Sequence, residues 1–207
     1  MEGLFWAAVT VGLTFWPGSE LPLPFAALAV WKGAGVALLA VWAALQARSG
    51  DGWLLTGVLA FGAIGDVVLE VFGMTPGAVA FLIGHAFAIW LYTRNRTTPW
   101  RWASFGVVPI IVCISAWLPA DRAMAAPVGL YAFFLAVMAV TAIHSRFPGA
   151  AIGAWLFVAS DLLIFASIGP LSRSFLPDLL VWPLYFVGQA MIAWDVAYRL
   201  REQEVPA

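Results

Sequence analysis

The chain has 207 residues, of which 63% are hydrophobic and only 10% are charged, and its mean hydropathy is +0.94. A soluble domain carries about a quarter charged residues, so this composition excludes a soluble globular protein and predicts an integral membrane protein. The net charge of −1 argues against a nucleic-acid partner, which would require a basic surface. The single cysteine, Cys113, can form no internal disulfide.

Eight apolar segments of roughly membrane-spanning length follow one another along the chain. They are residues 4–16, 25–47, 53–72, 77–94, 102–118, 124–145, 150–168 and 176–199. Only helices and closed barrels satisfy a backbone in lipid, and these long runs show no alternation. The expected fold is therefore all-α, with eight transmembrane helices in a single domain over residues 1–207. Because Glu2 stands where a signal peptide has a basic region, we expect the first segment to be retained.

The distribution of arginines predicts the orientation. On an eight-helix path, one side of the membrane holds Arg48, Arg94, Arg96, Arg101, Arg146, Arg199 and Arg201. The other side holds only Arg122 and Arg173. The positive-inside rule then places both termini in the cytoplasm, and the expected location is the bacterial inner (plasma) membrane.

An internal repeat relates the two halves of the chain, about residues 1–96 and 101–201. The third segment contains Gly65-Asp66 and the seventh contains Ser160-Asp161. The fourth and eighth segments share a longer pattern, Phe81-x-x-Gly84-His85-Ala86 and Tyr185-x-x-Gly188-Gln189-Ala190, each with a tryptophan five residues after the His or Gln. This order predicts a parallel 4+4 repeat about an axis along the membrane normal.

Six polar side chains fall at one predicted depth. They are Lys32, Asp66, His85, Tyr131, Asp161 and Tyr185, each six to nine residues from the predicted extracytoplasmic end of its segment. At 1.5 Å per residue this is a layer about 9–14 Å below that surface. Ionisable groups in lipid surroundings are costly, so a shared depth indicates a site or the polar lining of a pore. Glu70 lies one turn beyond Asp66 and is expected at the mouth.

Each of these residues also has a purely structural interpretation. The two aspartates could fix helix packing, with Lys32 as their counter-charge, and His85 could be a packed core histidine. Tyr131, Tyr185 and Gln189 could form interhelical hydrogen bonds, and Ser160 could be a small packing residue. Asp195, one turn before Arg199, is expected to form an interfacial ion pair.

No familiar soluble-enzyme motif is present. The sequence has no Gly-x-Ser-x-Gly, no HExxH, no P-loop and no Cys/His cluster with metal-ligand spacing. Neither a metal nor a cofactor is therefore expected.

The ordered motifs of the chain resemble those of the YhhN family of membrane proteins, whose characterised animal members are lysoplasmalogenases. The motifs are Gly65-Asp66-x-x-Leu69, Gly84-His85, Ser160-Asp161 and Tyr185-x-x-x-Gln189, in eight segments. The family's Lys-Pro in the second helix is here Lys32-Gly33, which departs from the pattern at the proline. The resemblance covers nearly the whole chain.

The resemblance implies hydrolysis of the vinyl ether bond of a lysoplasmalogen, giving a fatty aldehyde and glycerophosphoethanolamine or glycerophosphocholine. Protonation of the vinyl ether makes an oxocarbenium ion that water attacks, as in glycosidases. The expected catalytic pair is Asp66 and Asp161, since two carboxyls in a low dielectric do not both ionise readily and one can serve as the acid. The other members of the site would bind substrate or tune the pair: Lys32, Glu70, His85, Tyr131, Ser160, Tyr185 and Gln189.

Two other functions remain open from the residues alone. A parallel repeat with intramembrane carboxylates also suits a small proton-coupled transporter, although the polar layer lies in one leaflet only. The third possibility is a lipid-binding protein without turnover. The expected partners are a lysophospholipid substrate and membrane lipid, and the sequence leaves the oligomeric state open.

Overall fold

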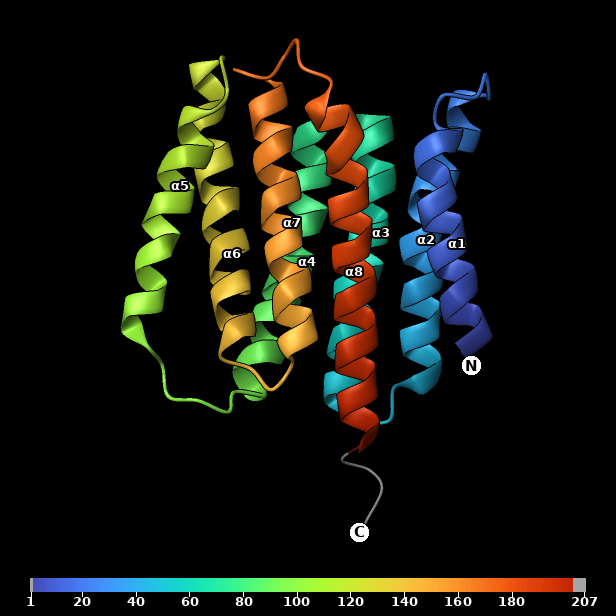
Figure 1. Cartoon of the computed structure of the whole chain (residues 1–207), viewed down its shortest axis with the longest axis vertical. Helices are drawn as coiled ribbons and strands as arrows, with labels where there is room; N and C mark the ends of the chain where they lie inside the picture. The colour runs from blue at the N-terminus through green and yellow to red at the C-terminus, as the bar shows by residue number, and fades with distance from the viewer. Residues whose placement is uncertain (1, 203–207) are drawn as a thin grey trace.

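The computed structural model describes residues 2–202, most of which lie in long helices that run side by side (Figure 1). Within this range there are eight α-helices, two short 3₁₀ helices and no β-strand. In chain order they are α1 (Glu2–Gly18), α2 (Phe25–Gln46), α3 (Gly50–Phe72), α4 (Met74–Arg94), η1 (Trp102–Gly106), α5 (Val107–Trp117), η2 (Arg122–Met124), α6 (Ala125–Ile143), α7 (Pro148–Ser167) and α8 (Leu176–Glu202). The expected all-α fold is confirmed.

Each predicted segment corresponds to one α-helix, and the largest difference is at residues 102–118. There the chain forms η1 before it enters α5, so the fifth helix is shorter than the sequence predicted. Pro109 lies in the first turn of α5. A proline is tolerated in the first turn, where its missing N–H has no intrahelical partner to lose, so the α-helix begins just before it.

Six helical segments are long and apolar enough to cross a membrane: α2, α3, α4, η2 with α6, α7 and α8. Helix α1 has 17 residues, and η1 with α5 forms a shorter apolar helix over residues 102–117. These lengths support six spans on their own. The crossing of α1 and α5 remains a prediction.

A tight turn joins α3 to α4 through a single residue, Gly73. Its φ is +92°, in the region that favours glycine, and its N–H donates to the carbonyl of Leu69. The next helix starts at once, with the N–H of Gly77 on the carbonyl of Gly73. The short connection holds α3 and α4 as an antiparallel pair, and these two helices carry Asp66 and His85.

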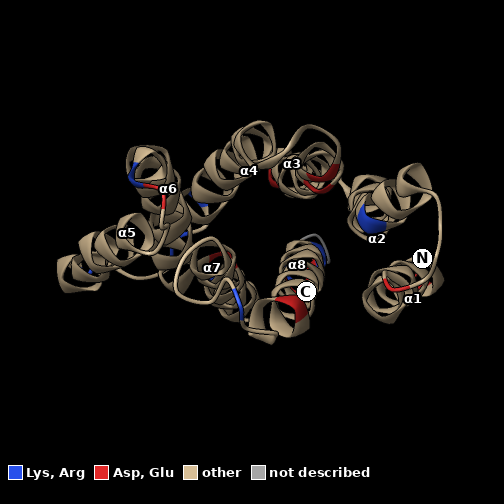
Figure 2. Ribbon diagram, turned by 90° about the horizontal axis from the view of Figure 1, so that it is seen from above, with Lys and Arg blue, Asp and Glu red and all other residues tan. Residues whose placement is uncertain are grey.

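Four helices occupy the centre of the bundle, and two pairs flank it. Viewed from above, α3 and α4 face α7 and α8, with α1 and α2 at one end and α5 and α6 at the other (Figure 2). Helix α2 packs on α3 and also on α8, while α6 packs on α7 and also on α4. Each second helix thus contacts the third helix of its own half and the fourth helix of the other half.

Close backbone contacts between helices also occur at equivalent positions of the two halves. A Cβ on Gly188 would lie 2.6 Å from the carbonyl oxygen of Gly153, eight residues before Asp161. A Cβ on Gly84 would lie 3.4 Å from the carbonyl oxygen of Val58, eight residues before Asp66. Small residues let helices approach closely in membranes. The repeat remains a prediction, and its equivalent positions make equivalent contacts here.

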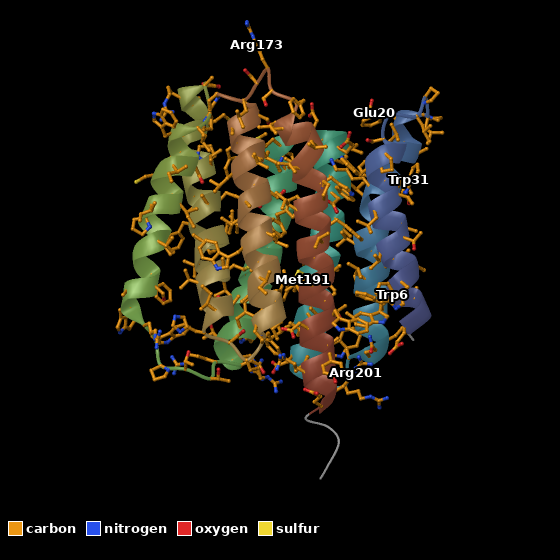
Figure 3. The ribbon with its side chains drawn as sticks, viewed as in Figure 1. Trp6, Glu20, Trp31, Arg173, Met191 and Arg201 are labelled. Carbon is orange, nitrogen blue, oxygen red and sulfur yellow. The ribbon has the colours of Figure 1, made fainter. Side chains whose placement is uncertain are left out.

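Arg173 and Arg201 lie at opposite ends of the bundle (Figure 3). Helix α1 begins, and helix α8 ends, at the end of the bundle where Arg201 lies (Figure 1). At that end Arg199 Nε lies 2.8 Å from Asp195 Oδ1, which confirms the predicted ion pair. Asp195 Oδ2 also accepts from the N–H of Ala150 at 3.0 Å and so caps the start of α7. The bond to Ala150 joins α7 to α8 at the end away from the site.

Candidate functional site

The first centre of the site is Asp66, buried on α3. The Tyr185 hydroxyl of α8 donates to Asp66 Oδ2 at 2.9 Å, and Nε2 of Gln189, one turn further along α8, contacts the same hydroxyl at 3.5 Å. Both partners are buried. Gly62 makes room for them, because a Cβ there would lie 2.8 Å from Gln189 Nε2. The carboxyl is therefore oriented from across the bundle by a residue of the other half of the chain.

The second centre is Asp161, buried on α7. The Tyr131 hydroxyl of α6 donates to Asp161 Oδ2 at 2.6 Å, and Nε2 of His85 on α4 lies 3.1 Å from that hydroxyl. This distance is at the short end of the range for a hydrogen bond from a hydroxyl to an oxygen acceptor. The three side chains form one continuous chain, Asp161–Tyr131–His85, across three helices.

The two centres have the same composition in outline. Each runs from an aspartate to a tyrosine and then to a residue at the His/Gln position of the repeat, giving Asp66–Tyr185–Gln189 and Asp161–Tyr131–His85. All six side chains are buried. Their contacts join the members of the predicted polar layer in two groups, with no direct hydrogen bond between the aspartates in the described residues. A carboxyl held by a phenol in dry surroundings can donate or accept a proton at a fixed position.

Lys32 pairs with Glu70 and hydrogen-bonds to neither aspartate. Its Nζ lies 2.8 Å from Glu70 Oε2, between α2 and α3, and the two side chains are 18% and 34% exposed. The sequence had suggested Lys32 as a counter-charge of the aspartates and Glu70 as a residue of the mouth. The ion pair lies at the partly open edge of the Asp66 centre, where each charge neutralises the other.

Ser160 contributes to packing between helices. Its hydroxyl donates to the carbonyl of Val181 on α8 at 2.9 Å, and the residue is fully buried. This bond lies close to Pro183, which interrupts the backbone hydrogen bonding of α8. Of the expected site residues, Ser160 is the one whose polar group is directed to a backbone and not to the two centres.

An apolar cavity of about 170 Å³ leads to the Asp161 centre. Most of its lining comes from the first turns of α4, the first turns of α6 and the last turns of α7, with Leu69 added from α3. Thr75, Tyr131 and Asp161 are its polar members. Val79 on α4 and Leu130 on α6 also line it and are 55% and 60% exposed, so the cavity reaches the outer surface between these helices.

Sequence reasoning missed Phe81 and the apolar lining of this cavity. The Phe81 ring lies 5.8 Å from the Tyr185 ring and 6.0 Å from the Phe157 ring, and a Cβ on Gly65 would lie 2.8 Å from it. Phe81 is the repeat equivalent of Tyr185, and this was the one available signal. The other lining residues are apolar, as most of the chain is, so composition could not separate them from residues that face lipid.

The described residues offer no cluster suited to a metal. Between residues 2 and 202, no group of three or more His, Cys, Asp or Glu side chains is arranged to hold an ion. The groups that the two aspartate centres do offer are suited to proton transfer and hydrogen bonding.

A family model, that of the YhhN family, matches residues 27–196. The match covers helices α2 to α8 except their extreme ends, and it includes both aspartate centres. Neither the curated proteins nor the solved structures that were compared give a significant match.

Proposed function

Because the chain belongs to the YhhN family of membrane proteins, we propose that it is an intramembrane hydrolase that cleaves the vinyl ether bond of a lysoplasmalogen. The products are a fatty aldehyde and glycerophosphoethanolamine or glycerophosphocholine. The enzyme is proposed to act in a bacterial inner membrane.

One observation carries this proposal. An apolar cavity that reaches the lipid-facing surface ends at a buried carboxyl, Asp161, whose orientation is fixed by Tyr131 at 2.6 Å. A single fatty chain fits such a lining, because apolar pockets with a few placed polar groups bind apolar ligands and orient them. The fatty chain of the lipid enters the cavity sideways from the bilayer, past Val79 and Leu130.

The cavity gives the two aspartates different parts in the reaction. Asp161 lines the cavity and donates a proton to the β-carbon of the vinyl ether, so the double bond is consumed and a new C–H bond forms. The positive charge is then shared by the α-carbon and the ether oxygen. Asp66 does not line the cavity, and we assign to it, as the second carboxyl of the pair, the electrostatic stabilisation of this cation. Water adds to the α-carbon and loses one proton. The resulting hemiacetal passes its hydroxyl proton to the glycerol oxygen as the bond between that oxygen and the α-carbon breaks, which releases the aldehyde.

The proposed topology has eight spans, with both termini in the cytoplasm and a parallel repeat of four helices. It is supported by the six long helices, the position of the arginines and the matching contacts of Gly84 and Gly188. In this orientation the cavity lies in the extracytoplasmic half of the bilayer, because it is formed where α4 and α6 begin and α7 ends. The polar head of the lipid then stays in the outer interface while its first carbons reach Asp161.

The test is release of fatty aldehyde from lysoplasmenylethanolamine by the purified chain in detergent or nanodiscs. Asp66→Asn and Asp161→Asn should each lower turnover by about 10²–10⁴-fold, the usual contribution of a positioned acid or base. Asp178→Asn is the matched control, since Asp178 is exposed at the start of α8. Retained turnover in a folded Asp66→Asn or Asp161→Asn protein would refute the assignment. Absence of aldehyde from the wild-type chain, with proton-coupled flux in proteoliposomes, would instead identify a transporter.

A further inference from the structure

A second, much smaller chamber lies at the centre of the bundle. Its volume is about 10 Å³, and it is lined by residues of α3, α4, α6, α7 and α8. His85 and Gln189 are its polar members, and Gly62, Phe81 and Phe157 are among the others. The two aspartate centres therefore meet here, because His85 ends one hydrogen-bonded chain and Gln189 ends the other.

The Gln189 side chain has a hydrogen-bonding group left over. The residue is 2% exposed, its Nε2 contacts Tyr185 at 3.5 Å, and its Oε1 is buried with no protein partner in the described structure. Exchanging the two amide atoms would leave Nε2 without a partner instead. Buried polar atoms in native proteins are nearly always paired with protein or with ordered water. Because Gln189 lines the chamber, a small polar molecule bound there would supply the partner that its amide lacks.

The size of the chamber identifies that ligand as water. A single water molecule needs about 10–15 Å³ of such space and two or more polar partners. We propose that one water molecule binds in this chamber between His85 and Gln189, and that it is the nucleophile of the hydrolysis. The position of the water follows from geometry alone, whereas its role as the nucleophile rests on the proposed function.

The hydrogen-bonded series His85–Tyr131–Asp161 then carries one proton of this water back to Asp161, the acid of the reaction. After Asp161 has given its proton to the substrate, its carboxylate accepts the Tyr131 O–H, and the Tyr131 oxygen can accept the His85 Nε2–H. His85 Nδ1 is then free to accept a proton from water. When the water oxygen bonds to the α-carbon, one of its protons passes to Nδ1, the Nε2 proton passes to Tyr131, and the Tyr131 proton passes to Asp161. The acid is restored, the water oxygen stays on the hemiacetal, and no further reactant is needed.

Phe81 separates the water from the lipid chain. Its side chain lines both the apolar cavity and the small chamber, and no other described residue lines both. The cation forms on one side of this ring and the water is held on the other. A displacement of the Phe81 ring brings the two together, and until then the water is kept from the substrate.

Two measurements test the inference, and the first is independent of activity. A density map of the wild-type chain that resolves ordered water should show a peak within hydrogen-bonding distance of Gln189 and His85. Gly62→Ala should abolish it, because the added methyl lies 2.8 Å from Gln189 Nε2. Gly57→Ala on the same helix is the control, because its methyl lies 3.4 Å from the Phe87 ring and away from the chamber. An empty chamber in such a map would overturn the water site.

The second measurement follows the fate of the cation. When water is not delivered, the neighbouring hydroxyl of the glycerol can add to the cation and lose its proton to the Asp161 carboxylate. The product is a cyclic acetal, an isomer of the substrate. Gln189→Leu and Gly62→Ala should make the cyclic acetal the main product, while Gly57→Ala should release aldehyde as the wild type does. A fall in both products together would overturn the role of this water as the nucleophile. If the wild-type chain gives neither product, the proposed function fails, and the density map alone decides whether the chamber holds water.

Discussion

Replacing Tyr131 with phenylalanine removes one hydroxyl from the Asp161 centre and keeps the aromatic ring. That hydroxyl donates to Asp161 at 2.6 Å and contacts His85 Nε2 at 3.1 Å. A hydrogen bond to a charged group contributes about 1.5–3 kcal/mol. Since about 1.4 kcal/mol corresponds to a tenfold change in rate, kcat should fall roughly 10- to 100-fold.

The KM of the same variant should change by less than about threefold, because loss of a bond that matters in the transition state leaves ground-state binding in place. The ring that replaces Tyr131 would still line the cavity and still pack against Phe165, whose ring centre lies 5.9 Å from that of the native tyrosine. Initial rates of aldehyde formation over a range of lipid concentrations separate the two constants. Tyr198→Phe is the matched control, since Tyr198 on α8 is 48% exposed.

Two results would refute this reasoning. The first is a kcat for Tyr131→Phe within about twofold of the wild type, which would remove the hydroxyl from the mechanism. The second is a rise in KM at constant kcat, which would make the hydroxyl a substrate-binding group. Thermal unfolding of the variant in detergent checks that a loss of rate does not reflect a loss of folded protein.

The remaining predictions concern the cavity, the ion pair and the helix contact. Ala78→Phe fills part of the apolar cavity, so KM should rise more for long-chain than for short-chain lysolipids, measured by aldehyde release. Glu70→Gln leaves the half-buried Lys32 unpaired and should lower the unfolding temperature. The double variant Glu70→Gln with Lys32→Met should recover part of the lost unfolding temperature, because no buried charge is then left unpaired. Gly188→Ala places a methyl 2.6 Å from a backbone carbonyl of α7 and should destabilise the fold by about 1–3 kcal/mol, unlike Gly3→Ala, where the methyl meets no neighbouring atom.

The helices were predictable because their signal is strong and local. Long apolar runs between turn residues define α2 to α4 and α6 to α8 closely, and the predicted Asp195–Arg199 pair depends on a spacing of one helical turn. The shared depth of the polar residues could also be counted along the helices. The expected positions of Asp66 and Asp161 therefore needed no knowledge of which helices are neighbours.

The partners of those residues could not be predicted, because they depend on helix packing across the bundle. Depth alone does not say that Tyr131 binds Asp161 while Tyr185 binds Asp66, or that Lys32 turns to Glu70. The apolar cavity had no sequence signal at all. In a membrane protein the same residue types face lipid, neighbouring helices and ligand, so hydropathy does not distinguish these three environments.

One hydrogen bond in each aspartate centre crosses between the two halves of the chain. Asp66 in residues 1–96 receives its bond from Tyr185, and Tyr131 in residues 101–201 is in contact with His85 of the first half. Neither half could assemble a working centre alone. A chain divided in the connection between α4 and η1 should therefore be inactive as separate fragments and regain activity only when both are produced together. At this position of the predicted repeat the first half has His85 and the second has Gln189, so both side chains can bind water but only the histidine can pass a proton on.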